Sequence, residues 1–118
     1  YLKYFEENHL PKNIDYLSLD IDPSDATLKA LKELPFSNYR FAIITFEHDF
    51  YLSGADVMNE SRNFLKSHGY KIIVSNVLCT GRDFEDWYIH PKLVDVKKYK
   101  SFQYSHIECA KIFEGLTK

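Results

Sequence analysis

The sequence predicts an α/β domain in which parallel strands alternate with helices and an antiparallel hairpin closes the sheet. Three observations support this fold class. Apolar, strand-forming runs alternate with amphipathic segments over much of the chain. The run from Phe41 to Phe46 is unbroken, as expected of a strand that is covered on both faces. Two later strand-like runs are separated only by a tight turn around Gly81, which indicates a hairpin. We therefore expect helices on both faces of a mixed sheet.

Length and composition agree with a single globular domain over residues 1–118. Of these residues, 45% are hydrophobic and 27% are charged, and a domain of this size buries roughly two thirds of its unfolded surface. The net charge is −2 with acids and bases well mixed, which argues against a nucleic-acid partner. No apolar run approaches the ~20 residues that span a bilayer, and no secretory signal opens the chain. We therefore expect no membrane partner.

The two cysteines, Cys79 and Cys109, lie far apart in the sequence and fit no metal-ligand spacing. We expect both to be buried free thiols, which are typical of a reducing compartment. The sequence therefore predicts a cytoplasmic protein.

The first part of the chain predicts a helix, a strand and a second helix. Leu2 to His9 has the pattern of a helix end. The apolar run from Ile14 to Ile21 is expected to be the first strand. In the helix that follows, Asp22 is expected to be the N-cap, Pro23 occupies the first helical position, and Pro35 ends the helix.

The middle of the chain predicts a second strand and a third helix. The strand is expected from Arg40 to Glu47. Ser53 to His68 has helical spacing of apolar residues. Ser53 and Asp56 resemble a capping box at its start, and Gly69 supplies its C-terminal stop.

The last part predicts the hairpin and a closing helix. Its two strands are expected from Tyr70 to Leu78 and from Phe84 to His90. A helix is then expected from about Phe102 to Phe113, closed by Gly115. The expected buried face of this helix is Phe102, His106, Cys109, Ala110 and Phe113.

Polar side chains follow the first two predicted strands. Asp20 and Asp22 close the first strand, and Glu47, His48 and Asp49 close the second. Ligands of open α/β sheets bind in the crevice beyond the carboxyl ends of the strands, so these groups are candidates for contacting a ligand. His48 is the natural general base near neutral pH. Two alternatives remain open, a divalent-metal site of oxygens and one imidazole and an ordinary solvated loop.

Trp87 is a further candidate for a substrate contact, with packing within the hairpin as the structural alternative. The chain contains no HExxH or CxxC spacing that would predict a structural metal. It also lacks a Gly-x-Ser-x-Gly sequence, which argues against hydrolysis by a serine nucleophile.

Three blocks of sequence resemble the FkbM-type methyltransferases, which use S-adenosylmethionine. Leu10 to Asp22 is similar to the family strand that ends Asp-aliphatic-Glu-Gly. Tyr39 to His48 resembles the next strand, which often ends Glu-His-Asn. Gly69-Tyr70 and Phe84 to Pro91 resemble the closing hairpin with its Asp-Trp signature. The resemblance therefore covers the second half of the family fold.

The resemblance implies a partial Rossmann-like methyltransferase sheet. Its first two strands would be parallel, and its fourth strand would lie between the second and the third. The implied acceptor is a hydroxyl or carboxylate of a small molecule or sugar. The residues implied by position are Asp20 and His48 for catalysis, Asp20 and Asp22 for the cofactor, and Glu47, Asp49 and Trp87 for the substrate.

The chain also departs from the family pattern. Pro23 stands where the family usually has glycine, and Asp22 stands where it has glutamate. The four glycines form no Gly-x-Gly cluster, although a backbone cradle for a nucleotide cofactor needs such glycines. We therefore expect the cofactor-binding half to be absent, and the isolated chain to bind no S-adenosylmethionine and to be inactive.

A sheet without that half leaves the edge of the strand from Ile14 to Ile21 unpaired. Exposed edges and apolar patches favour association, so the expected partner is a second copy of the chain or the missing N-terminal half. Two other functions stay open. One is a non-catalytic oligomerising module, and the other is a metal- or nucleotide-binding fragment of another doubly wound family.

Overall fold

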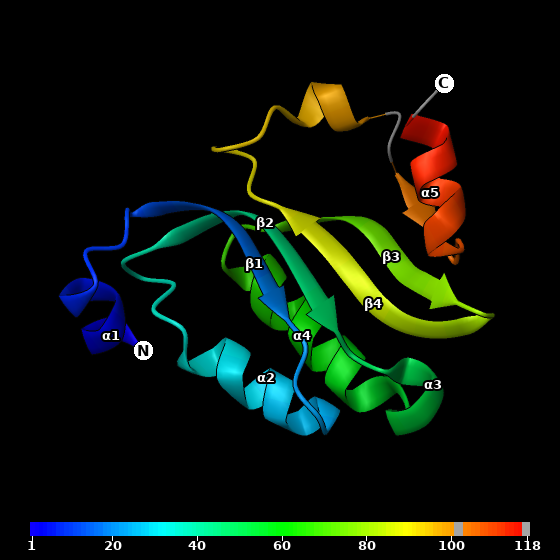
Figure 1. Cartoon of the computed structure of the whole chain (residues 1–118), viewed down its shortest axis with the longest axis horizontal. Coiled ribbons are helices and arrows are strands. Elements are labelled where there is room, and N and C mark those ends of the chain that lie inside the picture. Colours follow the sequence, from blue (N-terminus) through cyan, green and yellow to red (C-terminus); the bar gives the residue numbers. More distant parts are fainter. Residues whose placement is uncertain (101–102, 117–118) are drawn as a thin grey trace.

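One mixed sheet of five strands in the order β1-β2-β4-β3-β5 organises the part of the chain that the structure describes (Figure 1). The structure is a computed structural model and describes residues 1–100 and 103–116. The strands are β1 (Asn13–Leu19), β2 (Arg40–Glu47), β3 (Lys71–Cys79), β4 (Arg82–Ile89) and β5 (Tyr104–Ser105). The helices are α1 (Leu2–Glu7), α2 (Ser24–Glu33), α3 (Phe50–Ser53), α4 (Ala55–Ser67) and α5 (Cys109–Leu116), with a 3₁₀ turn η1 (Val96–Tyr99).

The pairing of the first four strands is the one that we expected. β1 and β2 are parallel, and β4 lies antiparallel between β2 and β3. The hairpin β3–β4 is joined by the tight turn at Thr80-Gly81. The short strand β5, which pairs parallel with β3, was not predicted because its two residues carry no periodic signal.

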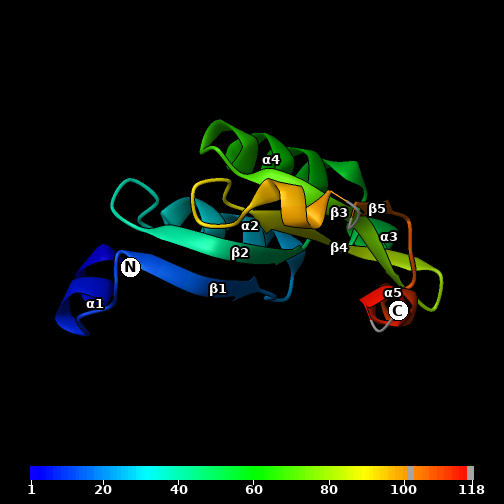
Figure 2. The ribbon, with the colours of Figure 1, turned by 90° about the horizontal axis from the view of Figure 1, so that it is seen from above.

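Helices cover the two faces of the sheet unequally. α2 and α4 pack against each other on one face, and α5 packs against β3 on the other (Figure 2). The predicted helices on both faces are therefore confirmed only over the β3–β4 part. The second face is open over β1 and β2, where Tyr16 is 56% exposed and Ile43 is 36% exposed. Because side chains alternate along a strand, both residues lie on the face opposite to that of the partly buried Leu17 and the fully buried Ile44.

The two faces have separate cores. The core under α2 and α4 is aromatic and aliphatic, and it contains Leu31 of α2, which is fully buried. The core under α5 is smaller. Its buried members are Ile73, Val74, Val77, Ile89 and Ile112.

Both predicted N-caps are wrong. α2 begins at Ser24, so Asp22 lies outside the helix and its side chain makes no cap. Thr27 instead binds both backbone groups of Ile21, accepting from the N–H at 3.1 Å and donating to the carbonyl at 2.6 Å. The helix predicted from Ser53 begins at Ala55 instead, because Gly54, with a φ of +80°, separates α4 from the short helix α3, which was not predicted. A positive φ interrupts a right-handed helix.

The predicted last helix is also wrong in its first half. His106 has a φ of +54°, which is incompatible with a helix interior, and the chain forms β5 before α5 starts at Cys109. On α5 the fully buried residue is Ile112, whereas Ala110 and the loop residue His106 are exposed. Phe102 and the side chain of Phe113 lie outside the described residues.

Both cysteines are free thiols, as expected, but neither is buried: Cys79 is exposed at the end of β3 and Cys109 is half-buried. Among residues 1–100 and 103–116, no helix combines the length and the apolar character needed to cross a bilayer.

Candidate functional site

The strands β1 and β2 end side by side (Figure 1), and the chain places several carboxylates at these ends. Asp20 directly follows β1, Glu47 ends β2, and Asp49 comes two residues later. The carboxylates of Asp20 and Asp49 both lie close enough to Glu47 to raise its pKa. Glu85 of β4 is the direct cross-strand partner of Glu47. The parallel register of β1 and β2 therefore produces a carboxylate cluster, which we define as Asp20, Glu47, Asp49 and Glu85.

The environment of this carboxylate cluster favours protonated acids. Burial and the neighbouring carboxylates of Asp20 and Asp49 together raise the pKa of Glu47 to about 9. Burial also raises the pKa of Glu85, although the indole N–H of Trp87 opposes this by donating to Glu85 Oε1 at 2.5 Å. At neutral pH, Glu47 therefore carries a proton beside ionisable neighbours, an arrangement that can donate and accept hydrogen bonds at one place.

Asp49 contributes a buried polar atom without a partner. Its side chain is 5% exposed, and its Oδ1 has no hydrogen-bond partner among the described residues. The backbone is left-handed there, with φ 49° and ψ 47°, and its N–H donates to the carbonyl of Phe84 at 3.1 Å. Unsatisfied buried acceptors and unusual backbone conformations concentrate at functional sites, so the carboxylate cluster has a second feature of a ligand site.

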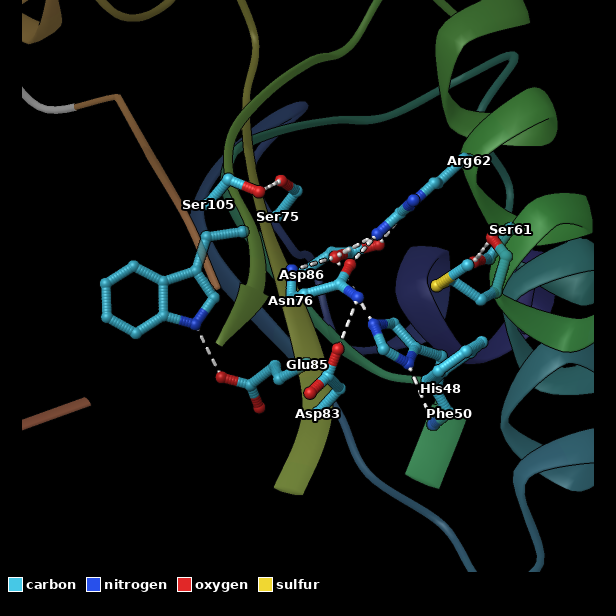
Figure 3. Close-up of polar contacts among 12 residues, drawn as sticks. His48, Phe50, Ser61, Arg62, Ser75, Asn76, Asp83, Glu85, Asp86 and Ser105 are labelled. Carbon is cyan, nitrogen blue, oxygen red and sulfur yellow. Dashed lines mark hydrogen bonds and ion pairs between the residues drawn. The ribbon is translucent and has the colours of Figure 1, made fainter. Parts of the chain in front are cut away.

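A buried polar network lies behind the loop that carries Asp49 (Figure 3). At its centre is Asp86 of β4, which is fully buried. Arg62 of α4 binds its two oxygens with Nε at 2.8 Å and Nη2 at 2.9 Å, and also contacts the Asn76 side chain. The backbone N–H of Asn76 donates to Asp86 Oδ1 at 2.8 Å. The network therefore joins α4, β3 and β4 through one carboxylate.

His48 completes this network rather than the carboxylate cluster. It is fully buried, its Nε2 lies 3.3 Å from Asp86 Oδ1, and its Nδ1 accepts the N–H of Phe50 at 3.1 Å. The Nε2 contact is a close polar contact that lacks the alignment of a hydrogen bond. The prediction of His48 as a general base is therefore corrected, because a ring without exposed atoms cannot reach a substrate.

Strand alternation explains the correction. Glu47 and His48 are consecutive, so their side chains leave β2 on opposite faces. Among the described residues, no three histidine, cysteine, aspartate or glutamate side chains are placed to hold a metal ion together. The alternative of a metal site that joins Asp20, Glu47 and His48 is therefore not supported.

The charge of Asp86 is strongly stabilised. Burial alone would raise its pKa, but the close contact with His48, the hydrogen bonds from Arg62 and the N–H of Asn76 outweigh burial and lower the pKa to about 2. This ion network holds the loop after β2 in place, and with it Asp49. Sequence reasoning missed Arg62 and Asn76. The Asp-Trp signature at Asp86 was the available signal, since a buried aspartate in a strand requires a cationic partner.

Two other predicted residues lie apart from the cluster. Asp22 is exposed in the turn before α2, and its side chain forms no hydrogen bond or ion pair with any residue in the described ranges. Trp87 is half-buried, packs with the α5-side core and reaches the cluster only through Glu85. The packing alternative for Trp87 therefore has direct structural support.

A hollow of about 290 Å³ opens beside Glu47. Arg82 and Tyr51 both line it, and the Arg82 guanidinium lies 5.7 Å from the centre of the Tyr51 ring. The hollow combines a protonated acid, a cation and an aromatic ring, which suits a small polar ligand. Its lining is Glu47, Tyr51, Cys79, Thr80, Arg82 and Phe84.

Comparisons of the chain with protein-family models, with curated proteins and with solved structures find no match.

Proposed function

We propose that this chain is the acceptor-side half of an FkbM-type O-methyltransferase fold, which binds a hydroxyl-bearing small molecule or sugar and is inactive without a cofactor-binding half. The observation that carries the proposal is the convergence of Asp20, Glu47 and Asp49 at the carboxyl ends of two adjacent parallel strands. The strand order, with an antiparallel β4 between β2 and β3, supports it. The free thiols suit a cytoplasmic location.

The chemistry of the carboxylate cluster fits the binding and activation of a hydroxyl group. In this proposal Asp20, which is exposed at the rim, accepts the hydroxyl proton as general base. Glu47 keeps its proton and donates a hydrogen bond to a second oxygen of the same ligand. The unpaired Oδ1 of Asp49 accepts a further hydroxyl. The contribution of the chain is therefore mainly positioning.

S-adenosylmethionine is the methyl donor that the resemblance implies, and the residues of this chain do not fit it as a complete site. Its binding requires close backbone approach at a glycine-rich turn after a strand. Gly54 lies between α3 and α4, Gly69 follows α4, and Gly81 is in the hairpin turn. No step is therefore assigned to the cofactor on this chain, and Asp20 and Asp22 are at most its rim contacts.

Isothermal titration calorimetry with S-adenosylmethionine tests the proposal. The chain alone is expected to bind none at about 1 mM, and saturable binding would contradict a missing cofactor half. Mixed with the cofactor-binding half of an FkbM-type methyltransferase, the chain should bind it, and Asp20→Asn should weaken this binding about tenfold. Asp15→Asn, an exposed aspartate on the same strand, is the matched control. Failure of the mixture to bind contradicts the proposal.

The second candidate function is a self-associating module, which the outer edge of β1 favours. β1 pairs only with β2 among the described strands. Beside this edge lies an apolar groove of about 490 Å³, lined by Tyr1, Tyr4, Phe5, Leu17, Leu19, Ile21, Ala30 and Leu34. The strand has Lys12 before its start and Asp20 and Asp22 after its end. Antiparallel pairing of two copies about Leu17 would set Lys12 of each opposite Asp22 of the other, which is a complementary arrangement of charge.

We expect light scattering at high protein concentration to give the mass of a dimer. Leu17→Lys places a charge in the apolar groove and should return the protein to a monomer. Ser18→Lys adds the same charge on the opposite, open face of the strand and should leave the dimer intact. A monomeric wild-type protein, or equal effects of the two substitutions, contradicts this second candidate.

A further inference from the structure

A second cavity, of about 550 Å³, opens at the opposite end of the strands from the carboxylate cluster. Four segments form its walls: residues 12–13 at the start of β1, 36–40 before and at the start of β2, 68–70 before β3, and 90–92 after β4. This end of the sheet has no part in the proposed function. Its volume lies within the range of small-molecule sites, which is about 300–1,000 Å³.

The lining of this cavity is strongly cationic. It contains three permanent cations, Lys12, Arg40 and Lys92, together with His68 and His90, and it includes no aspartate or glutamate. The chain as a whole has a net charge of −2, so this concentration of positive charge is local. A concave surface of one charge sign raises the local concentration of ligands of the opposite sign. The lining therefore selects for an anion.

His90 provides a fixed neutral donor among these cations. It is 7% exposed, and its Nδ1 accepts the N–H of Lys92 at 3.2 Å. In the neutral ring the proton is consequently on Nε2, which has no hydrogen-bond partner among the described residues. Burial, with Arg40 and Lys92, lowers the pKa of His90 and keeps the ring neutral. The ring is held edge-to-face against Tyr70 at 4.9 Å between centroids.

Aromatic side chains also line this cavity. Phe36 and His68 have ring centroids 5.3 Å apart, and Lys12 Nζ lies 4.3 Å from the centre of the Tyr39 ring. The Tyr70 hydroxyl is fixed because it accepts the N–H of Phe41 at 3.0 Å. Flat rings beside cations suit a ligand with a planar ring and an anionic group.

We propose that this cavity binds a small phosphorylated molecule with a planar ring, such as a nucleoside monophosphate. The phosphate lies among Lys12, Arg40 and Lys92, where it also accepts the Nε2–H of His90. The ring packs against Phe36 and His68, which both line the cavity. A doubly charged phosphate matches three cations that line one cavity better than a single carboxylate does, and a guanidinium such as that of Arg40 can bind two of its oxygens.

Nuclear magnetic resonance titrations at constant ionic strength test the proposal. Adenosine monophosphate should give saturable shifts of the His90 ring and of the amides of residues 36–40, with a Kd of about 1 mM or below. Inorganic phosphate should bind about tenfold more weakly, and adenosine should produce no shifts at about 1 mM. Absence of saturable shifts with adenosine monophosphate overturns the proposal. Equal binding of inorganic phosphate overturns the role of the ring.

Two variants locate the site and one controls for general electrostatics. Arg40→Gln and Lys92→Gln should each weaken binding of adenosine monophosphate about fivefold, which corresponds to the loss of one charge-assisted contact. Lys29→Gln removes the same charge from α2, outside the cavity lining, and should leave the affinity unchanged. Lys92 follows the last residue of β4, so its substitution remains informative if Arg40→Gln unfolds the protein. An equal loss for Lys29→Gln, or no loss for either cavity variant, overturns the proposal.

Discussion

Replacing Arg62 with methionine is expected to lower the free energy of unfolding by about 3 kcal/mol. The substitution keeps the length of the apolar side-chain stem but removes both hydrogen bonds to Asp86. Asp86 is fully buried, so its carboxylate would lose the Arg62 guanidinium without gaining contact with water. Urea denaturation followed by circular dichroism measures the loss.

Lys66→Met is the matched control, because Lys66 is exposed one turn further along α4. It should change the free energy of unfolding by no more than about 0.5 kcal/mol. The double variant Arg62→Met/Asp86→Asn removes the buried charge as well and should recover part of the loss. If Arg62→Met is as stable as Lys66→Met, the ion network does not hold the fold together.

The same network makes the free energy of unfolding fall at acid pH. The pKa of Asp86 is about 2 in the folded protein, below the ordinary value of 3.8. Its contribution is therefore fully present above the ordinary value and is lost as the pH falls towards about 2. This loss amounts to about 2 kcal/mol. In Arg62→Met the loss of stability at acid pH should be smaller, because the pKa values of Asp86 in the folded and the unfolded protein move closer together.

Replacing Glu47 with glutamine is expected to stabilise the protein increasingly as the pH rises. The pKa of Glu47 is raised from 4.5 to about 9 in the fold, so between these values the unfolded chain releases a proton that the folded protein retains. Wild-type stability therefore falls with rising pH through this window. The amide of Glu47→Gln does not ionise, so the variant does not lose stability in this way. Since Glu47 is half-buried and screened by solvent, we expect the free energy of unfolding of Glu47→Gln to exceed that of the wild type by about 1 kcal/mol near pH 8.

Urea midpoints at about pH 5, 7 and 8.5 measure the trend. Glu33→Gln, which neutralises an exposed glutamate on α2, is the control and should show a constant small difference from wild type. A difference between Glu47→Gln and wild type that does not grow with pH would mean that Glu47 ionises normally.

The sheet could be predicted from sequence because its signals are local. The unbroken apolar run in β2 and the tight turn at Thr80-Gly81 define the strands and the hairpin. Helix starts were harder to predict, because several residues compete for the same role. Asp22 is a residue type that often caps helices, but here Thr27 of α2 makes hydrogen bonds with the backbone N–H and carbonyl of Ile21. The left-handed His106 also cannot be recognised from its residue type alone.

The candidate site could be predicted only in part. Strand ends fix where Asp20, Glu47 and Asp49 lie, and parallel pairing of β1 and β2 brings them together. Burial depends on contacts between segments that are distant in the sequence. The burial of His48 could therefore not be predicted, and its predicted role as a general base was wrong. Arg62 was missed for the same reason, because its partner Asp86 lies 24 residues away on another element.

The pKa of Glu47 tests the central claim, that the ends of β1 and β2 form one carboxylate cluster. Carbon-13 resonances of the Glu47 carboxyl group, followed against pH, should give a pKa of about 9 in the wild-type protein. The value should fall in Asp20→Asn, because a like charge and a hydrogen bond are removed, and should not move in Asp15→Asn. A wild-type pKa near 4.5, or one that ignores the loss of Asp20, would show that these strand ends form no common site.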